Sequence, residues 1–586
     1  MSRFNFVSFF LTLCLATLTN SYGIKGVCSG VNTATGQRPF RQEFSKFKDS
    51  GPVFDLYILS LEQFQQRNQS ALLSYYQVAG IHGHPYISWD GVQGNYQAGY
   101  CTHGSILFPS WHRPYMAAYE QILWANAQRI AATYPVVQRS TYEAAAITFR
   151  IPYWDWAINS TMPDPINDPM ITVNSPHGLV NMANPLYNYT FHPQPSATDF
   201  PPNDSLAKYH STVRSPDAAG QSQSSVSNQI LQANAQAILV LSYQLIADQS
   251  DYAPFSNTGY TDGRGGNYNS LENMHDAIHA FVGNGGHMSI IPYASFDPIF
   301  YLHHANVDRL FAIWQAIYPN SYTTSEVNAQ GTFTISPGTN DTLYSPLTPF
   351  HSNYNGTLYT SKTARYTRHF GYSYPEVVDW GINATQLSSN TRANLNNLYN
   401  PTGSIATRPL LHKRSNGTAP CARSNATTEV IEYQYSINIR VDKSALHRPF
   451  FIHFFLGPVP SSPAAWPTAQ TLIATHSILY YASSITNIKR TTYGQLPLNH
   501  ALEGINSPLD PDCVVQLLKE ALCWRVQDFQ GQHVDTGEVA NLKIFVVGRE
   551  VVEHGLRDRF PAYGEWSILR EATDGKVGGL GRGEGM

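Results

Sequence analysis

The sequence predicts a mainly α-helical core, residues 24–383, followed by a C-terminal β-rich, sandwich-like domain, residues 430–586. Three observations lead to this fold class. Apolar residues recur with helical spacing in several segments of the first half of the chain. Residues 384–429 are rich in Asn, Ser and Thr and are typical of a linker. After them, Val430–Val441 and Phe450–Leu456 alternate or run apolar, and strand-like segments recur to about Val552.

The N-terminus is typical of a secretory signal peptide, residues 1–23. Arg3 is basic, Phe6 to Leu18 form an apolar run, and Ser21-Tyr22-Gly23 is a small-x-small cleavage site. Nine Asn-x-Ser/Thr sequons also favour export, so we expect a secreted glycoprotein. The sequons begin at Asn68, Asn159, Asn188, Asn203, Asn340, Asn355, Asn383, Asn416 and Asn425.

Helical spacing predicts four core helices, and a further apolar segment, Phe300 to Trp314, is interpreted as a fifth. Residues 157–226 are rich in Pro, Asn and Ser and are predicted to be surface loops. The four helices are Val53–Gln66, Pro109–Ala132, Ile230–Ile246 and Leu271–Val282.

Histidines mark two of these helices. His275 and His279 stand at i and i+4, so both imidazoles leave one face of a helix. With 21 histidines in the chain, roughly one such pair arises by chance, and the spacing alone is weak evidence for a metal. The tandem pair His303-His304 strengthens it. A site built from imidazoles without carboxylates suits copper better than magnesium, calcium or manganese.

A second histidine set lies earlier in the chain. It comprises His82 in Gly80–Pro85, His103 in Tyr100-Cys101-Thr102-His103-Gly104, and His112 in Pro109–Arg113. With the downstream set, these motifs resemble the tyrosinases, a family of binuclear (type 3) copper proteins, over roughly residues 26–380. The long fungal forms are the most similar.

This resemblance implies a four-helix bundle that holds two copper ions and uses O2 as co-substrate. His82, His103 and His112 would bind the first copper, CuA, and His275, His279 and His304 the second, CuB. His303 is then expected to support the site, and His84 has no counterpart among the family's ligands. The implied reaction oxidises o-diphenols to o-quinones, and o-hydroxylation of monophenols such as tyrosine is left open.

Further residues receive roles from the same resemblance. Cys101 stands where fungal relatives carry a thioether bond to the histidine ring, here that of His103. Phe108 and Phe300 each precede a ligand histidine by four residues and are expected to pack beside the coppers. Asp308 and Arg309 are interpreted as an ion pair that supports the last helix.

Three residues bear on which phenols react. Glu272 lies one helical turn before His275 and is the expected proton acceptor. Asp276 occupies a position that is asparagine in many true tyrosinases, which puts monophenol hydroxylation in doubt. Ile291 is expected at the gate above CuA, where an aliphatic side chain leaves a wider opening. Catechol oxidase and o-aminophenol oxidase are the alternatives, and a hemocyanin-like oxygen carrier is a third.

Composition limits the partners. The net charge of −4 with no basic block excludes nucleic acid as an expected partner, and no second apolar run approaches a membrane span. Small phenols are the partners that the resemblance implies, and the oligomeric state is left open. Lys413-Arg414 in the linker suits a kexin-like protease. In long fungal relatives the C-terminal domain covers the copper site as a lid, so the resemblance implies a chain that is latent until it is cut near Arg414. Candidates for the residue that this lid inserts above the coppers are Phe454, Phe455, Tyr480 and Tyr481.

Cysteine usage fits an oxidising compartment. Cys14 belongs to the signal peptide and Cys101 to the expected thioether, which leaves Cys28, Cys421, Cys513 and Cys523. Four cysteines allow three pairings. Cys513–Cys523 is the local candidate, with Cys28–Cys421 as a link between core and tail.

Overall fold

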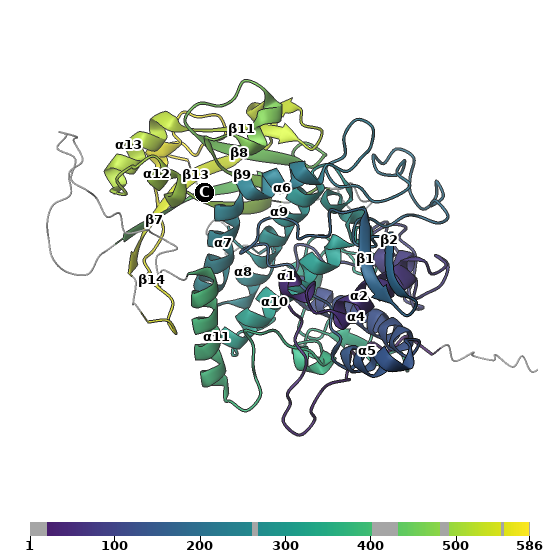
Figure 1. The fold of residues 1–586 in the computed structure, drawn as a ribbon. Coiled ribbons are helices and arrows are strands. Elements are labelled where there is room, and N and C mark those ends of the chain that lie inside the picture. The colour runs from purple at the N-terminus through teal and green to yellow at the C-terminus, as the bar shows by residue number, and fades with distance from the viewer. Residues whose placement is uncertain (1–19, 261–267, 401–431, 481–490, 553–555, 585–586) are drawn as a thin grey trace, which may run out of the picture.

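A computed structural model describes residues 20–260, 268–400, 432–480, 491–552 and 556–584. It contains a helical core and a C-terminal β-sheet domain, as predicted. Figure 1 shows the β domain lying against one side of the core, next to helices α6, α7 and α9. The predicted signal peptide lies outside the described residues, apart from 20–23, and so does Lys413-Arg414.

The predicted core helices are confirmed, with one change. The helix expected over Ile230–Ile246 is two helices, α6 and α7, which meet at Asn234 with a 60° bend. The Asn234 side chain donates to the carbonyl of Ile230, a local bond that competes with the helical pattern. The core helices are α1 Phe44–Phe47, α2 Pro52–Gln65, α3 Tyr75–Gly80, α4 Phe108–Ala131, α5 Val136–Thr148, α6 Ser224–Ala233, α7 Ala235–Asp248, α8 Tyr252–Ser256, α9 Leu271–Gly283, α10 Ile299–Ile317 and α11 Ala384–Tyr399.

Four of these helices form the frame of the core. Helix α4 packs against α2 and α10, and α10 also packs against α9. Nearly every residue of α10 is buried, and the buried residues of α4 include most of its first half. Helix α9 begins at Ser270, whose side chain accepts from the Asn273 N–H, and ends at Asn284 in the left-handed conformation. The caps fix where α9 starts, and therefore which side chains face α10.

The segment 157–226 is less irregular than predicted. It contains a hairpin of strands β1 Met170–Ser175 and β2 Gly178–Ala183, joined by a tight turn. Apart from the start of α6, the remaining described residues of this segment lie in turns and loops, as expected. The hairpin went unpredicted because its second strand is mostly exposed and carries no alternating apolar pattern.

The prediction that a linker begins at residue 384 is wrong, because α11 occupies Ala384–Tyr399. Its side chains at Ser388, Thr391, Leu395 and Tyr399 are buried at helical spacing against the core. Asn383 caps the helix through a bond from the Gln386 N–H. The Asn- and Ser-rich composition concealed a narrow buried face, and the helical core extends to Tyr399.

The C-terminal domain is built from two antiparallel sheets, one ordered β10-β7-β13-β14 with β15 beside β13, the other β12-β11-β8-β9. Buried side chains of both sheets belong to the same apolar core. The strands are β7 Glu432–Asp442, β8 Phe450–Leu456, β9 Leu472–Ile478, β10 Thr491–Pro497, β11 Leu522–Asp528, β12 His533–Val534, β13 Lys543–Val552, β14 Ala562–Tyr563 and β15 Ser567–Ile568. Short strand pairs in the core are β3 Glu326–Asn328 with β4 Thr339–Asp341, and β5 Pro346–His351 with β6 Leu358–Thr360. Helices α12 Asn499–Gly504 and α13 Pro511–Ala521 complete the domain.

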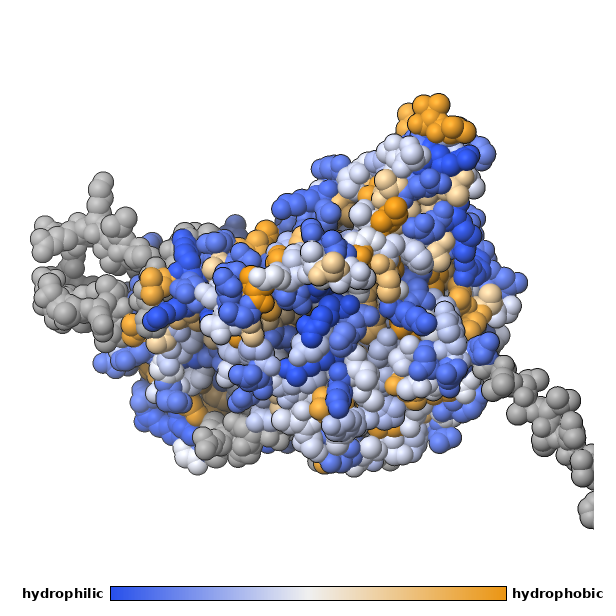
Figure 2. All heavy atoms as spheres, turned by 90° about the horizontal axis from the view of Figure 1, so that it is seen from below, coloured by the Kyte–Doolittle hydropathy of each residue, from blue (hydrophilic) through white to orange (hydrophobic). Residues whose placement is uncertain are grey.

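Direct bonds join the two domains. The Thr475 N–H donates to the Asn234 side chain at 2.8 Å, and Arg549 pairs with Asp248 at 2.9 Å. In the face shown in Figure 2, polar residues predominate and hydrophobic ones form small groups. Among the described residues no single helix is long and apolar enough to cross a membrane, although the bent pair α6–α7 reaches that length and composition when taken together.

Both predicted disulfides are wrong. Cys28 and Cys523 are free thiols, which excludes Cys28–Cys421 and Cys513–Cys523. Cys513 is disulfide-bonded and therefore does not pair with the free Cys523. Closeness in sequence misled the prediction, because α13 carries Cys513 away from the strand that bears Cys523.

Candidate metal centre

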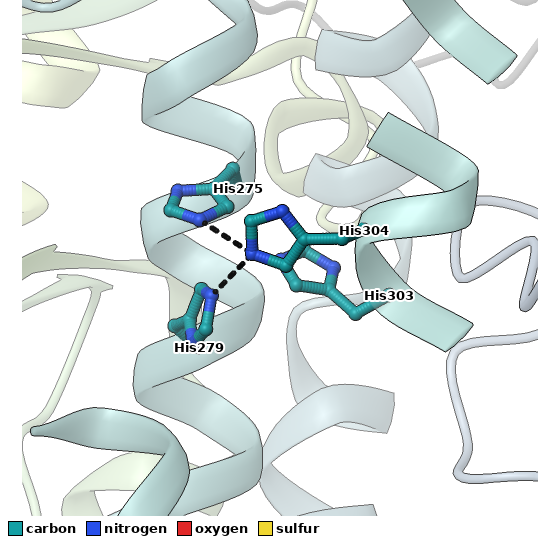
Figure 3. Close-up of side chains that lie close together, drawn as sticks. All are labelled: His275, His279, His303 and His304. Carbon is teal, nitrogen blue, oxygen red and sulfur yellow. Dashed lines mark hydrogen bonds between the residues drawn. The ribbon is translucent and has the colours of Figure 1, made fainter. Parts of the chain in front are cut away.

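The downstream histidines converge between two helices. Helix α9 carries His275 and His279, and α10 carries His304 opposite them (Figure 3). The Nε2 atoms of His275 and His279 each lie 3.2 Å from Nε2 of His304. All three rings are buried. Three imidazole nitrogens therefore point at one place, as the i, i+4 spacing predicts.

The outer nitrogens of two of these rings are held by acceptors. His279 Nδ1 lies 2.7 Å from the carbonyl of Met288, and His275 Nδ1 lies 2.9 Å from Oδ1 of Asp276. Such bonds place the proton on Nδ1 and leave the Nε2 lone pair free. Burial lowers the pKa of His279 to about 4 and that of His275 well below its usual value. Neutral imidazole is the form that binds a metal ion.

His303 lies closer to this group than the sequence suggested. Its ring stacks on His275 at 5.2 Å and meets His279 edge-on at 4.8 Å. All four histidines offer nitrogens within 4.8 Å of one another. Figure 3 shows the His303 ring behind that of His304, which alone faces both partners on α9.

The upstream histidines come from less regular structure. His82 follows α3, His103 lies in the loop before α4, and His112 lies within α4. Their ring centroids are 5.4 to 5.9 Å apart. His82 Nδ1 lies 3.2 Å from the carbonyl of Ile291, and His112 Nδ1 lies 2.8 Å from that of Phe108.

The Nε2 atoms of His82, His103 and His112 are buried and make no hydrogen bond within the described part of the chain. A buried polar atom without a partner costs free energy unless something else binds it. Burial also lowers the pKa of all three rings, that of His112 to about 3. Three neutral, inward-facing nitrogens match the donor set that copper prefers.

Two glycines bring this loop close to its neighbours. A Cβ at Gly83 would collide with the backbone of Pro292, and one at Gly99 with the carbonyl of His82. The His84 N–H donates to the Pro292 carbonyl at 2.9 Å. The loop that carries His82 is therefore pinned by backbone contacts rather than by a helix.

Cys101 lies against the same loop. Its buried sulfur is 3.0 Å from the carbonyl of His82 and 3.3 Å from Nδ1 of His103. Sulfur and imidazole are thus adjacent, and the thioether bond stays a prediction.

The two histidine groups are in contact with each other. The rings of His112 and His304 stack at 4.6 Å, and those of His103 and His275 lie 5.7 Å apart. Phenylalanines bracket the contact. Phe108 lies 4.7 Å from His112 and 4.9 Å from His275. Phe300 lies 4.9 Å from His82 and 4.0 Å from His304.

Two carboxylates lie beside the downstream histidines. Buried Glu272 accepts from the N–H groups of Gly104 and Thr258, at 2.8 Å each, and from the Thr258 hydroxyl at 3.1 Å. Burial raises the pKa of Asp276 to about 7, although the ammonium of Lys443 opposes the rise. Asp276 also accepts a hydrogen bond from the neighbouring His275 ring, a contact that the sequence motif does not indicate.

Ile291 begins a short 3-10 helix, Ile291–Phe296, beside the upstream histidines. Its side chain is largely buried and its carbonyl faces His82. The residue thus supports a histidine through its backbone, a role that no side-chain motif indicates.

The predicted Asp308–Arg309 ion pair is wrong. Asp308 accepts from Arg113 at 2.6 Å and from Arg41 at 3.2 Å, while Arg309 pairs with Asp155 and Glu376. Successive residues on a helix point about 100° apart, and here the two side chains reach different partners. Arg113 follows His112 and Asp308 lies one turn after His304, so the ion pair between Arg113 and Asp308 links α4 to α10.

The C-terminal domain approaches the downstream histidines through Lys443, the residue that follows strand β7. Its Nζ lies 3.8 Å from Asp276 and 3.5 Å from the Thr258 hydroxyl. Phe454 and Phe455 instead belong to β8, where Phe454 packs on Trp524 in the domain core, and Tyr480 packs on His447. Of the four expected insertions, Tyr481 lies outside the described residues.

Comparisons with known proteins agree with this geometry. Residues 72–317 match the common central domain of tyrosinase, and residues 434–546 match the tyrosinase C-terminal domain. A tyrosinase of Neurospora crassa is 30% identical over 96% of this chain and 99% of its own length. One from Podospora anserina is 34% identical over 76% of this chain and 87% of its own.

Solved structures extend the likeness to three dimensions. A recombinant mushroom tyrosinase superposes with a TM-score of 0.79 at 27% identity, over 93% of this chain and 98% of that one. The buried imidazole nitrogens fit two copper ions, and the matches cover both domains. The chain therefore belongs to the tyrosinase family, the copper enzymes that oxidise phenols with O2.

Proposed function

We propose that this protein oxidises o-diphenols to o-quinones, with His82, His103 and His112 binding one copper ion and His275, His279 and His304 the other. The observation that carries the proposal is the convergence of buried Nε2 atoms. Acceptors hold Nδ1 of four of the rings, those of His82, His112, His275 and His279. His304, rather than His303, is assigned as ligand because its Nε2 is the atom nearest both histidines of α9.

Two diphenol molecules and one O2 give two o-quinones and two waters, so each diphenol loses two electrons and two protons. The copper ions, when bound, supply the electron acceptor and the binding place for O2. Glu272 is the group that takes a proton from the phenol. Its carboxylate is kept in place by the Gly104 N–H and by the N–H and hydroxyl of Thr258.

The proposal is confined to diphenols. Asp276 accepts from His275 through Oδ1, and that oxygen is therefore not free to orient a water with Glu272. Ile291 is assigned as the gate residue that limits which rings enter.

We also propose that the C-terminal domain keeps the uncut chain latent, and that a cut at Lys413-Arg414 after export activates it. Support comes from the interdomain bonds and from Lys443, which reaches the second histidine group. One matched structure carries the description of latent and active mushroom tyrosinase.

Oxygen uptake by the copper-loaded full chain, before and after limited proteolysis, tests both proposals. We expect little uptake before the cut and rapid uptake afterwards with a catechol, slower uptake with an o-aminophenol, and none with tyrosine. Equal activity before and after the cut would contradict latency. Reversible O2 binding without turnover on any substrate would instead identify an oxygen carrier.

A further inference from the structure

Lys443 of the C-terminal domain lies against two core residues, Asp276 and Thr258, whose oxygens can accept from a cation. The Lys443 side chain is 11% exposed and the Asp276 side chain 8%, so the pair is shielded from water. Its Nζ lies 3.8 Å from Asp276 Oδ2 and 3.5 Å from Thr258 Oγ1. The ammonium thus meets one carboxylate and one hydroxyl, both from the core.

The core residues are arranged to accept this charge. Asp276 uses Oδ1 for His275, which leaves Oδ2 for a second donor. The Thr258 hydroxyl donates to Glu272 at 3.1 Å, so its lone pairs are free to accept from an ammonium. A carboxylate buried this deeply is costly unless a cation pairs with it. Without the C-terminal domain, Asp276 would lose that cation.

The surrounding charges favour a cation as well. Glu272 lies behind Thr258, and Glu326 lies near Asn257, the residue before Thr258. Arg448, the next cation on the same loop, pairs with Asp528 within its own domain and does not compensate these acids.

We propose that Asp276 and Thr258 form a subsite for a primary ammonium group, filled by Lys443 in the uncut chain and by the ammonium of a phenolic amine once the C-terminal domain has moved away. This rests on the proposed diphenol oxidation and adds the substrate class to it. Lys443 is an internal stand-in for the substrate's amine, and Asp276 is a specificity residue that selects cationic substrates over neutral or anionic ones.

The first test uses the full chain. Lys443→Ala removes the ammonium and leaves space for an added one. We expect butylammonium chloride to raise the thermal midpoint of this variant, relative to sodium chloride, and 1-butanol to have no such effect. The wild type and Arg448→Ala, which removes a cation from the same loop, should not respond. A rise with butanol as large as that with butylammonium, or no rise with either, would overturn the subsite.

The second test measures selectivity and does not depend on the folding of the Lys443 variant. The copper-loaded full chain is cut by added protease without separating the fragments. Three catechols that differ only in an aminoethyl, hydroxyethyl or carboxyethyl group are then compared by kcat/KM. We expect the aminoethyl compound to be preferred over the hydroxyethyl one by about tenfold, the worth of one charge-assisted hydrogen bond.

In Asp276→Asn this ratio should fall close to one, while in Glu143→Gln, which removes an exposed carboxylate of α5, it should not change. Because both substrates are measured on one preparation, differences in copper content cancel. Equal ratios in wild type and Asp276→Asn would refute the subsite. Failure to oxidise any of the three catechols would refute the proposed function instead, so the two failures are distinguishable.

Discussion

The two histidine groups use the same side chains but are built differently. The downstream group lies on two regular helices, with His275 and His279 one turn apart on α9 and His304 on α10. The upstream group takes only His112 from a long helix. His82 and His103 come from loops pinned by backbone contacts and by Cys101.

The two groups also differ in the acceptors that hold the Nδ1 atoms of their rings. A carboxylate holds His275, whereas backbone carbonyls hold His82 and His112. A carboxylate strengthens the imidazole as a ligand, while a loop relies on close packing to fix the ring. We therefore expect the downstream group to depend on single polar contacts and the upstream group on the rigidity of its loop.

The largest effect is expected where the groups meet. His304→Ala removes the nitrogen nearest both His275 and His279, so bound copper should fall from about two ions per chain to about one. Diphenol oxidation should be abolished, because the second ion is needed for O2. Metal analysis of the purified variant checks this. Exposed His369→Ala should keep both ions, and full copper content in His304→Ala would contradict the ligand assignment.

Asp308→Ala should weaken both groups together. It leaves the guanidinium group of Arg113 buried without a carboxylate, while Arg41 keeps Glu120, and the loss costs about 3–5 kcal/mol of unfolding free energy. Urea unfolding followed by fluorescence measures the loss. Glu538→Ala, at an exposed site, should change stability by less than about 0.5 kcal/mol. A similarly small change in Asp308→Ala would show that the network is dispensable.

Asp276→Asn should act on the downstream group alone. Without the carboxylate, the His275 ring loses its strong acceptor, and copper affinity at this group should drop about 10- to 100-fold. Competition with a graded series of chelators measures the two affinities separately. Equal weakening of both ions would mean that Asp276 acts through the fold rather than through His275.

Cys101→Ala should act on the upstream group alone and by less, about tenfold in copper affinity, because packing also fixes His103. Mass spectrometry of the wild type provides the chemical check. A peptide that contains Cys101 and His103 should lack two hydrogen atoms if the thioether is present. An intact thiol in active enzyme would rule that bond out.

The smallest effect is expected at the gate. Ile291→Phe narrows the opening by a few carbon atoms, so kcat/KM for a bulky catechol should fall about tenfold or less relative to a small one. The backbone contact to His82 is kept, and bound copper should not change. A matching loss of copper would place Ile291 in the frame of the metal centre instead.

Much of this site could be predicted from sequence. Histidines at helical spacing and short motifs around His82, His103 and His112 identify a metal centre because both signals are local. The helices followed from apolar periodicity. The contacts of Asp276 with Lys443 and of Asp308 with Arg113 could not be predicted, since they join residues far apart in the chain.

Amino-acid composition gave a wrong prediction where the spacing of apolar residues would have been the better guide. The Asn- and Ser-rich segment after residue 383 has the composition of a linker, but a few buried side chains at helical spacing are enough to fold α11. The disulfide pairing failed because distance along the chain says little about distance in space when a helix intervenes.

Helix α11 and the interdomain bonds also affect how a cut would act. Asn396 of α11 donates to the carbonyls of Arg557 and Arg559, and Arg549 holds Asp248. A protease that severs the chain after α11 would leave these bonds intact, so the product is first a nicked complex of two fragments. Activation would then depend on dilution as well as on time, because dissociation of two fragments is favoured at low concentration whereas cleavage is not.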